Sequence, residues 1–409
     1  MQQKRGNAVV SVSAKAEQVI RTGHPWVYDT EVLRTDGKYE NGDIVDIISL
    51  RGSFLGAGFI NDHSKIRLRM LSRSPHDSMD EAFFAHRLQD AWDYRKTVMG
   101  NDLGACRVIF GEADFLPGLT VDRFENILVT QVLSLGIEKN KAMLFSLLHR
   151  ILAADGVKID GIYERNDVRI RELEGMTQGK GFFTIPGTQP PQSTTVTIRE
   201  NEISYLVDFE NGQKTGFFLD QKYNRRAIGT LARGRHVLDC FTHTGSFALN
   251  AALGGAAHVT AVDISQEAVD MAAKNAALNG LDDRMKFTTA NVFDLLPTLA
   301  NSPDKPYDMI ILDPPAFTKS RKTAANAIRG YKEINLRAMK LLPSGGYLAT
   351  CSCSHFMTDT MFRDMLESAA SDAGIMLRQV EIRTQSPDHP VLWNVPETDY
   401  LKFYIFQVI

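Results

Sequence analysis

The segment HVLDCFTHTGSFALNAALGGAAHVTAVDIS, residues 236–265, constrains the fold of this chain more than any other. It contains an apolar run that ends in Asp239, a turn with a glycine that opens a helical stretch, and a second apolar run that ends in Asp263. This order is typical of one β-α-β unit, in which the two strands are parallel. Strands and helices continue to alternate from residue 230 to the end. The sequence therefore predicts an α/β domain, a Rossmann-like, doubly wound parallel sheet with helices on both faces.

The two acidic strand ends and the turn between them predict the class of cofactor. An acidic residue at the end of the second strand, here Asp263, can accept hydrogen bonds from ribose hydroxyls. The turn has a single central glycine, Gly245, and lacks the Gly-x-Gly-x-x-Gly pattern of dinucleotide-binding proteins. The carboxylate of Asp239 would repel a pyrophosphate, whereas it suits the cationic amino-acid end of S-adenosylmethionine. The pattern favours a methyltransferase over a nicotinamide-dependent enzyme.

Two further segments supply candidate cofactor ligands. Asn291 ends the third strand, where its side-chain oxygen can accept from the adenine amine and Val292 offers apolar surface; Asn is also a good helix N-cap, and the two roles are compatible. Upstream, NGQKTGFFLDQKYNRR gathers polar residues that could close over the amino-acid end of the cofactor, or could form an ordinary polar connector. The candidates in it are Lys214, Asp220 and Gln221.

The fourth strand of this region, YDMIILDPPAF, indicates where the substrate binds. Proline cannot donate to a strand ladder, so the strand stops at Asp313-Pro314-Pro315. In an open α/β sheet this carboxyl edge is where ligands bind. A stiff loop that carries the carboxylate of Asp313 suits a planar base, and the pattern is typical of methyltransferases that act on planar nitrogenous substrates.

Two cysteines, Cys351 and Cys353, end the next strand, GGYLATCSCSHF, at the same edge. A cysteine there suits methylation at a carbon, because a thiolate that adds to C6 of a pyrimidine makes C5 nucleophilic. Cys is also among the most buried residue types, so a structural role is the alternative. If strand pairing continues, the two point to the same face. Cys353 lies further toward the strand end and is the preferred nucleophile.

The first half of the chain predicts two other domains. Residues 1–75 are β-rich and typical of a small barrel, residues 76–190 mix helices and strands, and residues 191–409 hold a hairpin followed by the α/β domain. In SKIRLRML, strict alternation places Lys65, Arg67 and Arg69 on one face of a strand. That face is either an ordinary solvated basic face or an RNA-binding edge that contacts phosphates.

Composition limits the remaining classes. The net charge of −3 argues against a protein that coats nucleic acid, but not against an enzyme with a local basic strip. The four cysteines lack the spacing of a zinc site, so we expect no bound metal. A chain of this length needs no disulfides for stability, so we expect a reducing, cytoplasmic location. No apolar run approaches the length of a membrane span, and no signal-peptide core is present, so we expect no membrane partner.

Over nearly its whole length the chain resembles the bacterial ribosomal RNA large subunit methyltransferase I family, which methylates cytosine C5. The motifs that carry the resemblance are HPWVY, LPGLTVDRF, KTGFFLDQ, the D-x-F-x-x-T-G turn, DPPAF, RGYKEIN, CSHFM and DHPV. The resemblance implies an N-terminal RNA-binding PUA domain, a central α+β domain and a C-terminal class I S-adenosylmethionine-dependent methyltransferase. It also implies 5-methylcytidine in 23S rRNA as product and a nucleophile in a Ser-Cys-Ser element, which matches Ser352-Cys353-Ser354.

Other functions remain open from the sequence. A guanine-nitrogen methyltransferase of the same fold would act on rRNA without using Cys353. A non-catalytic RNA-binding assembly factor would retain the fold but would not need Asp239, Gly245, Asp263 and Asp313 together. Large-subunit rRNA is the expected partner, and a homodimer is a candidate assembly. Asp313 could orient the base or transfer a proton.

Overall fold

The computed structural model describes residues 6–185, 189–318 and 324–409. Contacts divide the chain into two compact units. Unit 1 comprises Met1–Ile198, Val207–Leu219 and Pro387–Thr398, and unit 2 comprises Arg199–Leu206, Asp220–Ser386 and Asp399–Ile409. Two excursions of the C-terminal region, 207–219 and 387–398, therefore belong to unit 1, which the sequence did not indicate.

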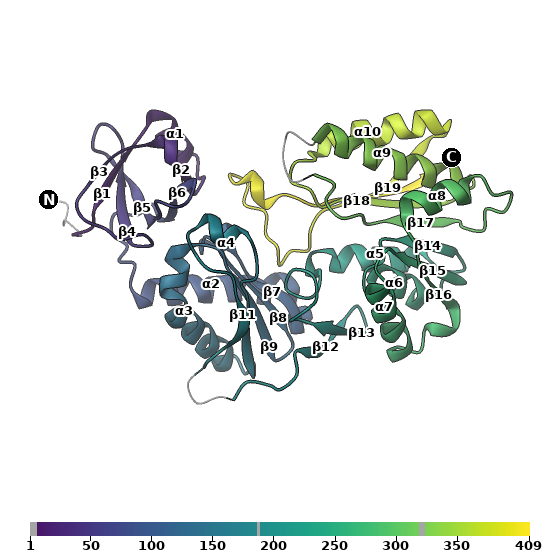
Figure 1. The fold of residues 1–409 in the computed structure, drawn as a ribbon, viewed down its shortest axis with the longest axis horizontal. Coiled ribbons are helices and arrows are strands. Elements are labelled where there is room, and N and C mark those ends of the chain that lie inside the picture. The colour runs from purple at the N-terminus through teal and green to yellow at the C-terminus, as the bar shows by residue number, and fades with distance from the viewer. Residues whose placement is uncertain (1–5, 186–188, 319–323) are drawn as a thin grey trace. The chain divides into compact units, whose positions relative to one another are not determined.

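The N-terminal part of unit 1 is a six-stranded sheet that curls around one apolar core (Figure 1). Alternating burial along its strands explains the fold, since the buried residues of Ile44–Ile48 alternate with partly exposed ones. Helix α1 (Ala14–Arg21) begins at Ser13, whose hydroxyl accepts from Ala16 N. In sheet order the strands are β2 (Trp26–Tyr28), β6 (Ile66–Ser72), β5 (Phe54–Ile60), β4 (Ile44–Ile48), β1 (Val9–Val12) and β3 (Val32–Asp36).

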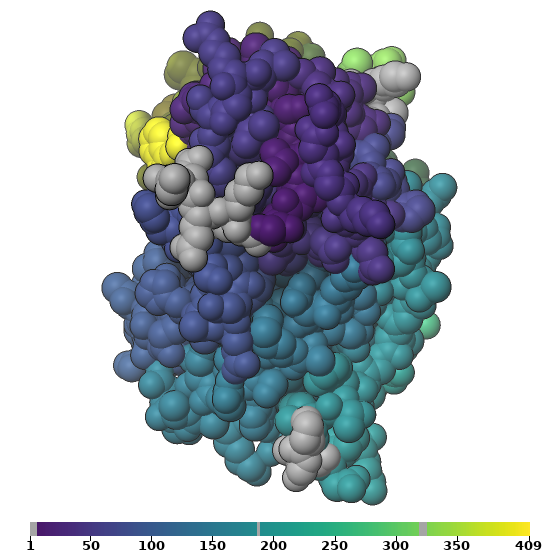
Figure 2. Space-filling model, turned by 90° about the vertical axis from the view of Figure 1, so that its left-hand side faces the viewer, coloured from purple at the N-terminus to yellow at the C-terminus, as the bar shows by residue number. Residues whose placement is uncertain are grey.

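The second part of unit 1 is a five-stranded sheet with two long helices, α2 (Glu81–Met99) and α3 (Leu135–Ala154). It also contains the short helix α4 (Ile170–Leu173). Figure 2 shows the purple residues of the curled sheet packed against the blue and teal residues of this part, in agreement with the hydrogen bond from Asn61 Nδ2 to Glu174 O (2.9 Å). In order the strands are β11 (Lys180–Phe183), β10 (Gly161–Arg165), β9 (Ile127–Val132), β8 (Leu119–Phe124) and β7 (Ala105–Phe110).

A hairpin of β12 (Thr195–Glu200) and β13 (Ile203–Asp208) connects the two regions of the chain. The hairpin expected from the sequence is confirmed, and its turn is Asn201-Glu202. Asn201 and Glu202 both have positive φ, 52° and 69°, as a two-residue turn of this hand requires.

Unit 2 contains a seven-stranded sheet with helices on both faces. Its first five strands are parallel, and the last two pair antiparallel, so the sheet is mixed and not purely parallel as the alternation predicted. In order the strands are β16 (Met285–Thr289), β15 (His258–Asp263), β14 (His236–Cys240), β17 (Met309–Leu312), β18 (Tyr347–Ser352), β20 (Lys402–Val408) and β19 (Leu377–Arg383). The chain order reverses between β14 and β17, which is where such sheets bind ligands.

The helices of unit 2 form two layers (Figure 1). Strand residues of one face, among them Leu238, Ile310 and Leu348, form a core with α8 (Val292–Ala300), α9 (Ala324–Leu341) and α10 (Asp359–Ala373). Because strand side chains alternate, the other face is left for α5 (Lys222–Leu231), α6 (Ser246–Leu253) and α7 (Gln266–Leu278). No helix of the described residues is long and apolar enough to cross a membrane.

Candidate active site

The carboxyl ends of the parallel strands in unit 2 bring four of the predicted residues to one edge. Asp239 and Asp263 lie at the ends of β14 and β15, Asp313 directly follows β17, and Cys351 is the penultimate residue of β18. The register aligns these ends, since Cys240 is opposite Leu312 and Leu312 is opposite Thr350. The sequence-predicted edge is thus one continuous row of carboxyl and thiol groups.

Asp239 is fully buried and keeps one oxygen for a ligand. Its Oδ2 accepts from Thr242 Oγ1 (2.6 Å) and from Ala248 N (3.0 Å), whereas Oδ1 has no hydrogen-bond partner among the described residues. Burial raises the pKa of Asp239 to about 7, and the neighbouring Asp313 adds to the rise. A buried acceptor without a partner is costly, so the carboxylate fits the cationic amino-acid end of S-adenosylmethionine.

The turn after β14 allows its backbone to lie very close to helix α7. Gly245 has φ +83°, and a Cβ there would lie 2.9 Å from Ala272 Cβ, so only glycine allows the helix to pack this closely. His243 N donates to Asp263 Oδ2 (2.9 Å), and Ser265 N donates to Asp263 Oδ1 (3.0 Å). These bonds fix the Asp263 carboxylate at the second strand end, where the remaining lone pairs can accept from ribose hydroxyls.

The third strand end confirms the N-cap role of Asn291. Its Oδ1 accepts from Phe293 N (3.1 Å), and its Nδ2 donates to Asp294 Oδ2 (2.9 Å). The expectation that Val292 offers apolar surface is wrong, because its side chain is 1 % exposed and belongs to the core. Phe293, which is 38 % exposed, is the residue with apolar surface at this position.

Asp313, Cys351 and Gln221 form one hydrogen-bonded cluster. Cys351 Sγ donates to Asp313 Oδ1 (2.8 Å), and Gln221 Nε2 donates to the same oxygen (3.2 Å). Desolvation raises the pKa of Asp313 to about 6. Burial and the Asp313 charge raise the pKa of the Cys351 thiol well above its usual range. Cys351 therefore stays protonated at neutral pH and acts as a donor to the carboxylate.

Cys353 differs from Cys351 because β18 ends at Ser352. The two cysteines would point to the same face only if strand pairing continued through Cys353, but it stops at Ser352. Cys353 is partly exposed, whereas Cys351 is buried. The ammonium group of Lys402 lies nearby and donates to Ser354 O (2.7 Å) and Tyr400 O (2.7 Å). Burial lowers the pKa of Lys402 to about 8, an effect that nearby Asp399 and Cys353 partly offset.

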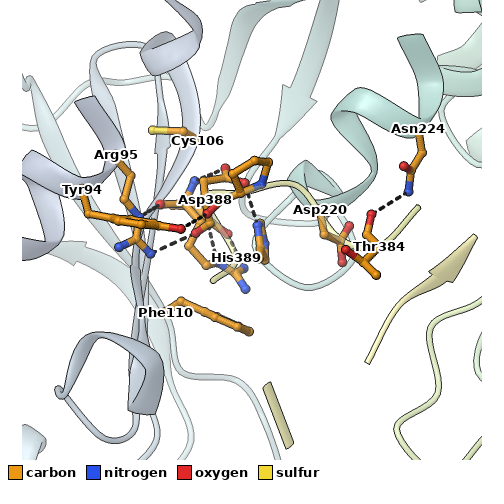
Figure 3. A network of polar contacts seen from close by, with 12 residues as sticks. Tyr94, Arg95, Cys106, Phe110, Asp220, Asn224, Thr384, Asp388 and His389 are labelled. Atoms are coloured by element: carbon orange, nitrogen blue, oxygen red, sulfur yellow. Dashed lines mark hydrogen bonds and ion pairs between the residues drawn. The ribbon is translucent and has the colours of Figure 1, made fainter. Parts of the chain in front are cut away.

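The loop before α5 places Asp220 and Gln221 next to the β19–β20 region. Tyr400 Oη donates to Asp220 Oδ2 (2.6 Å), and Ser386 N donates to Asp220 O (2.7 Å). Asn224 Nδ2 donates to Gln221 Oε1 (2.6 Å) and to Thr384 O (3.2 Å), as Figure 3 shows for the second bond.

Sequence reasoning missed the contributions of Tyr400 and Lys402. The available signal was a lone lysine within the apolar run LKFYIF. Among the residues described here, no group of three or more His, Cys, Asp or Glu side chains could hold a metal ion.

The basic residues predicted to bind RNA or the cofactor lie in unit 1, and they differ in solvent exposure and in ion pairing. Lys65 is exposed and precedes β6, and Arg67 pairs with Asp62. The prediction of a solvated face is wrong for Arg69, which is 7 % exposed because it pairs with Glu112 (3.2 Å) and Glu174 (2.9 Å). Lys214 is exposed, with its Nζ 4.6 Å from the centroid of the Phe218 ring.

Comparison with known protein families decides the class. Residues 188–406 match the family model described as S-adenosylmethionine-dependent methyltransferase. The chain belongs to this family. The cofactor is accordingly S-adenosylmethionine. Residues 10–73 match the model of a PUA-like domain, which identifies the curled sheet.

Curated relatives and solved structures agree with this assignment. Proteins named ribosomal RNA large subunit methyltransferase I, from Escherichia coli O139:H28 and Shigella boydii serotype 18, are 40 % identical over 395 residues, or 96 % of this chain and 97 % of theirs. This methyltransferase therefore belongs with them in one family. A putative S-adenosylmethionine-dependent methyltransferase from Streptococcus mutans has the same fold, with a TM-score of 0.80 at 22 % identity over 98 % of this chain and 99 % of its own. A second structure with the same fold is complexed with SAH, with a TM-score of 0.82 at 21 % identity over 98 % and 99 %.

Proposed function

We propose that this methyltransferase forms 5-methylcytidine in large-subunit (23S) rRNA and uses Cys353 as a covalent nucleophile. The observation that carries the proposal is a partly exposed cysteine beside a carboxyl–thiol cluster at the cofactor edge of the sheet. A nitrogen acceptor would need no such cysteine. The names of the relatives, which are 40 % identical over nearly the whole chain, support large-subunit rRNA as the substrate.

The proposed reaction begins at Cys353. Bound S-adenosylmethionine supplies an electrophilic methyl group. The Cys353 thiolate forms a bond to C6 of cytosine, and the electron pair that becomes available at C5 attacks the methyl carbon. Loss of the C5 proton to a base then allows the C6–S bond to break, which returns the thiolate and releases the product.

The neighbours of Cys353 have complementary roles in this proposal. The Lys402 ammonium interacts electrostatically with Cys353, and its positive charge would stabilise the negative charge of the attacking sulfur. Asp313, with a pKa of about 6, orients the base or receives its proton. Cys351 keeps its proton and holds the Asp313 carboxylate in place.

On the cofactor side we assign Asp239 and Asp263 to the amino-acid end and the ribose, and Asn291 to the adenine. Gly245 shapes the turn that follows Asp239, and Asp220 and Gln221 are the candidates for the amino-acid end of the cofactor in unit 2. Lys214, in unit 1, remains a candidate from the sequence alone. Phe293 replaces Val292 in this proposal, because only Phe293 has exposed apolar surface. In the PUA-like domain, Lys65 and Arg67 remain candidates for RNA contacts.

The proposal is tested by methyl transfer to deproteinised large-subunit rRNA, followed by digestion and nucleoside analysis. We expect 5-methylcytidine from the wild type and from Cys106→Ala, a matched control in unit 1, and none from Cys353→Ala. Methylguanosine as the product would support the nitrogen-methylating alternative. No transfer to RNA together with no cofactor binding would support a non-catalytic assembly factor.

A further inference from the structure

Unit 1 contains a hollow that the methylation chemistry does not use. The hollow is small, with a cavity volume of about 60 Å³, and its walls come from three separate stretches of the chain. Pro25 and Arg73 belong to the PUA-like domain, Arg87 and Phe115 to the second part of unit 1, and Leu392 to the excursion 387–398. The residues that face this hollow are therefore brought together by the tertiary fold and are not neighbours in the sequence.

Phe115 is held at the hollow in an unusual conformation. Its backbone has φ 57° and ψ 29°, a left-handed conformation that a bulky residue rarely adopts, and its side chain is 39 % exposed. Backbone strain of this kind persists where the surroundings impose it, and it concentrates at functional positions. The left-handed backbone of Phe115 thus costs conformational free energy, while its aromatic ring stays partly exposed to solvent.

Arg87 and Arg73 give the hollow positive charge. The Arg87 guanidinium carbon lies 4.9 Å from the Phe115 ring centroid and 5.1 Å from that of Phe83. Neither arginine forms an ion pair within the described part of the chain; Arg73 donates to the backbone oxygens of Ile20 and Gly23. The acidic side chain at the hollow, Glu112, is already bound by Arg69 and by Trp26 Nε1 (2.9 Å).

The excursion adds a second exposed ring next to Leu392. Trp393 is 93 % exposed, although tryptophan is usually largely buried. The excursion itself is well anchored, since Leu392 N donates to Thr398 Oγ1 (2.9 Å) and Glu397 pairs with His24 (3.1 Å). The exposure of Trp393 therefore does not result from a loose segment.

One buried arginine, Arg95, bonds to both segments that carry the exposed rings, and Figure 3 shows its contact with Asp388. Arg95 donates to both carboxylate oxygens of Asp114 (2.5 and 2.7 Å), directly before Phe115, and its Nη2 also donates to Asp388 O (2.9 Å) at the start of the excursion. Asp388 Oδ2 in turn accepts from Arg107 N (2.8 Å), and its Oδ1 contacts His389 Nδ1 (2.9 Å). Arg95 thus connects the two segments that carry the rings.

We propose that this hollow, with Trp393 next to Leu392 in the chain, binds a single-stranded segment of the RNA substrate. Exposed aromatic rings stack on unpaired bases, and unpaired arginines contact phosphates and base planes. Preformed rings and cations reduce the ordering cost of binding. The inference rests on the proposed RNA substrate, but it concerns affinity and not which base atom receives the methyl group.

The test is a fluorescence titration of the full-length protein with a short, mixed-sequence, fluorescein-labelled single-stranded RNA. Trp393→Ala removes a side chain that supports no core, and Phe115→Asn removes the ring while tolerating the left-handed backbone. Each should weaken RNA binding about 5- to 100-fold. Arg87→Gln should reduce the slope of log affinity against log salt by about one.

Controls separate this inference from the function proposed above. Arg34→Gln removes an exposed arginine already paired with Asp36 (2.6 Å) and should bind RNA like the wild type. In the wild type, RNA should quench the tryptophan emission, and in Trp393→Ala it should not. RNA affinity that stays within twofold of wild type in both aromatic variants, or equal competition by duplex RNA, would overturn the inference. If the hollow variants lose affinity but the product is a methylguanosine, the inference stands and the proposed chemistry fails.

Discussion

The ionisation of Asp239 should control how tightly this methyltransferase binds its cofactor. With a pKa of about 7, the buried carboxyl group is about nine-tenths protonated at pH 6 but only about one-quarter protonated at pH 7.5. If only the carboxylate binds the cationic amino-acid end, the ionised fraction sets the affinity. Affinity should then be about eightfold higher at pH 7.5 than at pH 6.

The assay is isothermal titration calorimetry with S-adenosylhomocysteine, whose amino group stays largely protonated below about pH 7.5. Asp239→Asn should bind about tenfold or more weakly at pH 7.5, because a hydrogen bond to a charged group is lost, and its affinity should no longer depend on pH. His243, whose burial lowers its pKa to about 4, is neutral throughout this range. Asp313→Asn removes the other titrating carboxyl and should keep an affinity that rises with pH.

Loss of folding cannot imitate this result. A carboxyl whose pKa is raised in the folded state binds its proton more tightly there than in the unfolded chain, so Asp239 stabilises the fold more at pH 6 than at pH 7.5. As the pH rises from 6 to 7.5, the contribution of Asp239 to folding stability falls, whereas the affinity for the cofactor rises. Equal wild-type affinities at both pH values, or wild-type affinity in Asp239→Asn, would refute the assignment of Asp239 to the amino-acid end.

Three further predictions concern residues of unit 2. Glu200→Gln should destabilise unit 2 by about 3–5 kcal/mol, because the buried Arg225 loses a bidentate partner (2.7 and 2.8 Å), and replacing both residues by Met should recover most of the loss. Urea unfolding is followed by far-UV circular dichroism, since all three tryptophans lie in unit 1. An unchanged free energy of unfolding in the single variant would contradict the prediction. Iodoacetamide should modify Cys353 in the native protein before the three buried cysteines, as peptide mass spectrometry will show; earlier labelling of a buried cysteine would count against the structure. Gly245→Ala should cost about 1–3 kcal/mol, since its methyl group would meet Ala272 Cβ at 2.9 Å, and should weaken cofactor binding; unchanged thermal unfolding would contradict it.

Local patterns in the sequence predict much of unit 2. Asp239, Asp263 and Asp313 could be placed at one edge because parallel strands bring their carboxyl ends together, and each acid directly ends or follows an apolar run. The hairpin at Asn201 was predictable for the same reason, since its turn chemistry is local. Strand identity and turn chemistry are properties of short segments, so the sequence alone carries them.

Contacts between distant segments could not be predicted. Arg69 alternates correctly along its strand, yet it is buried because Glu112 and Glu174, far away in sequence, provide carboxylates. The difference between Cys351 and Cys353 depends on where β18 ends, which its pairing with β20 decides. The membership of 387–398 in unit 1 depends on hydrogen bonds from Arg95 and Arg107, which no periodicity reveals.

The most direct test of covalent carbon methylation is to trap the intermediate. In RNA that contains 5-fluorocytidine, the fluorine at C5 cannot leave as a proton does, so the bond between enzyme and C6 should persist after methyl transfer. We expect a cofactor-dependent adduct that carries one methyl group, mapped by peptide mass spectrometry to Cys353 and absent in Cys353→Ala. An adduct on Cys351, or methylation of RNA by Cys353→Ala at the wild-type rate, would contradict the account.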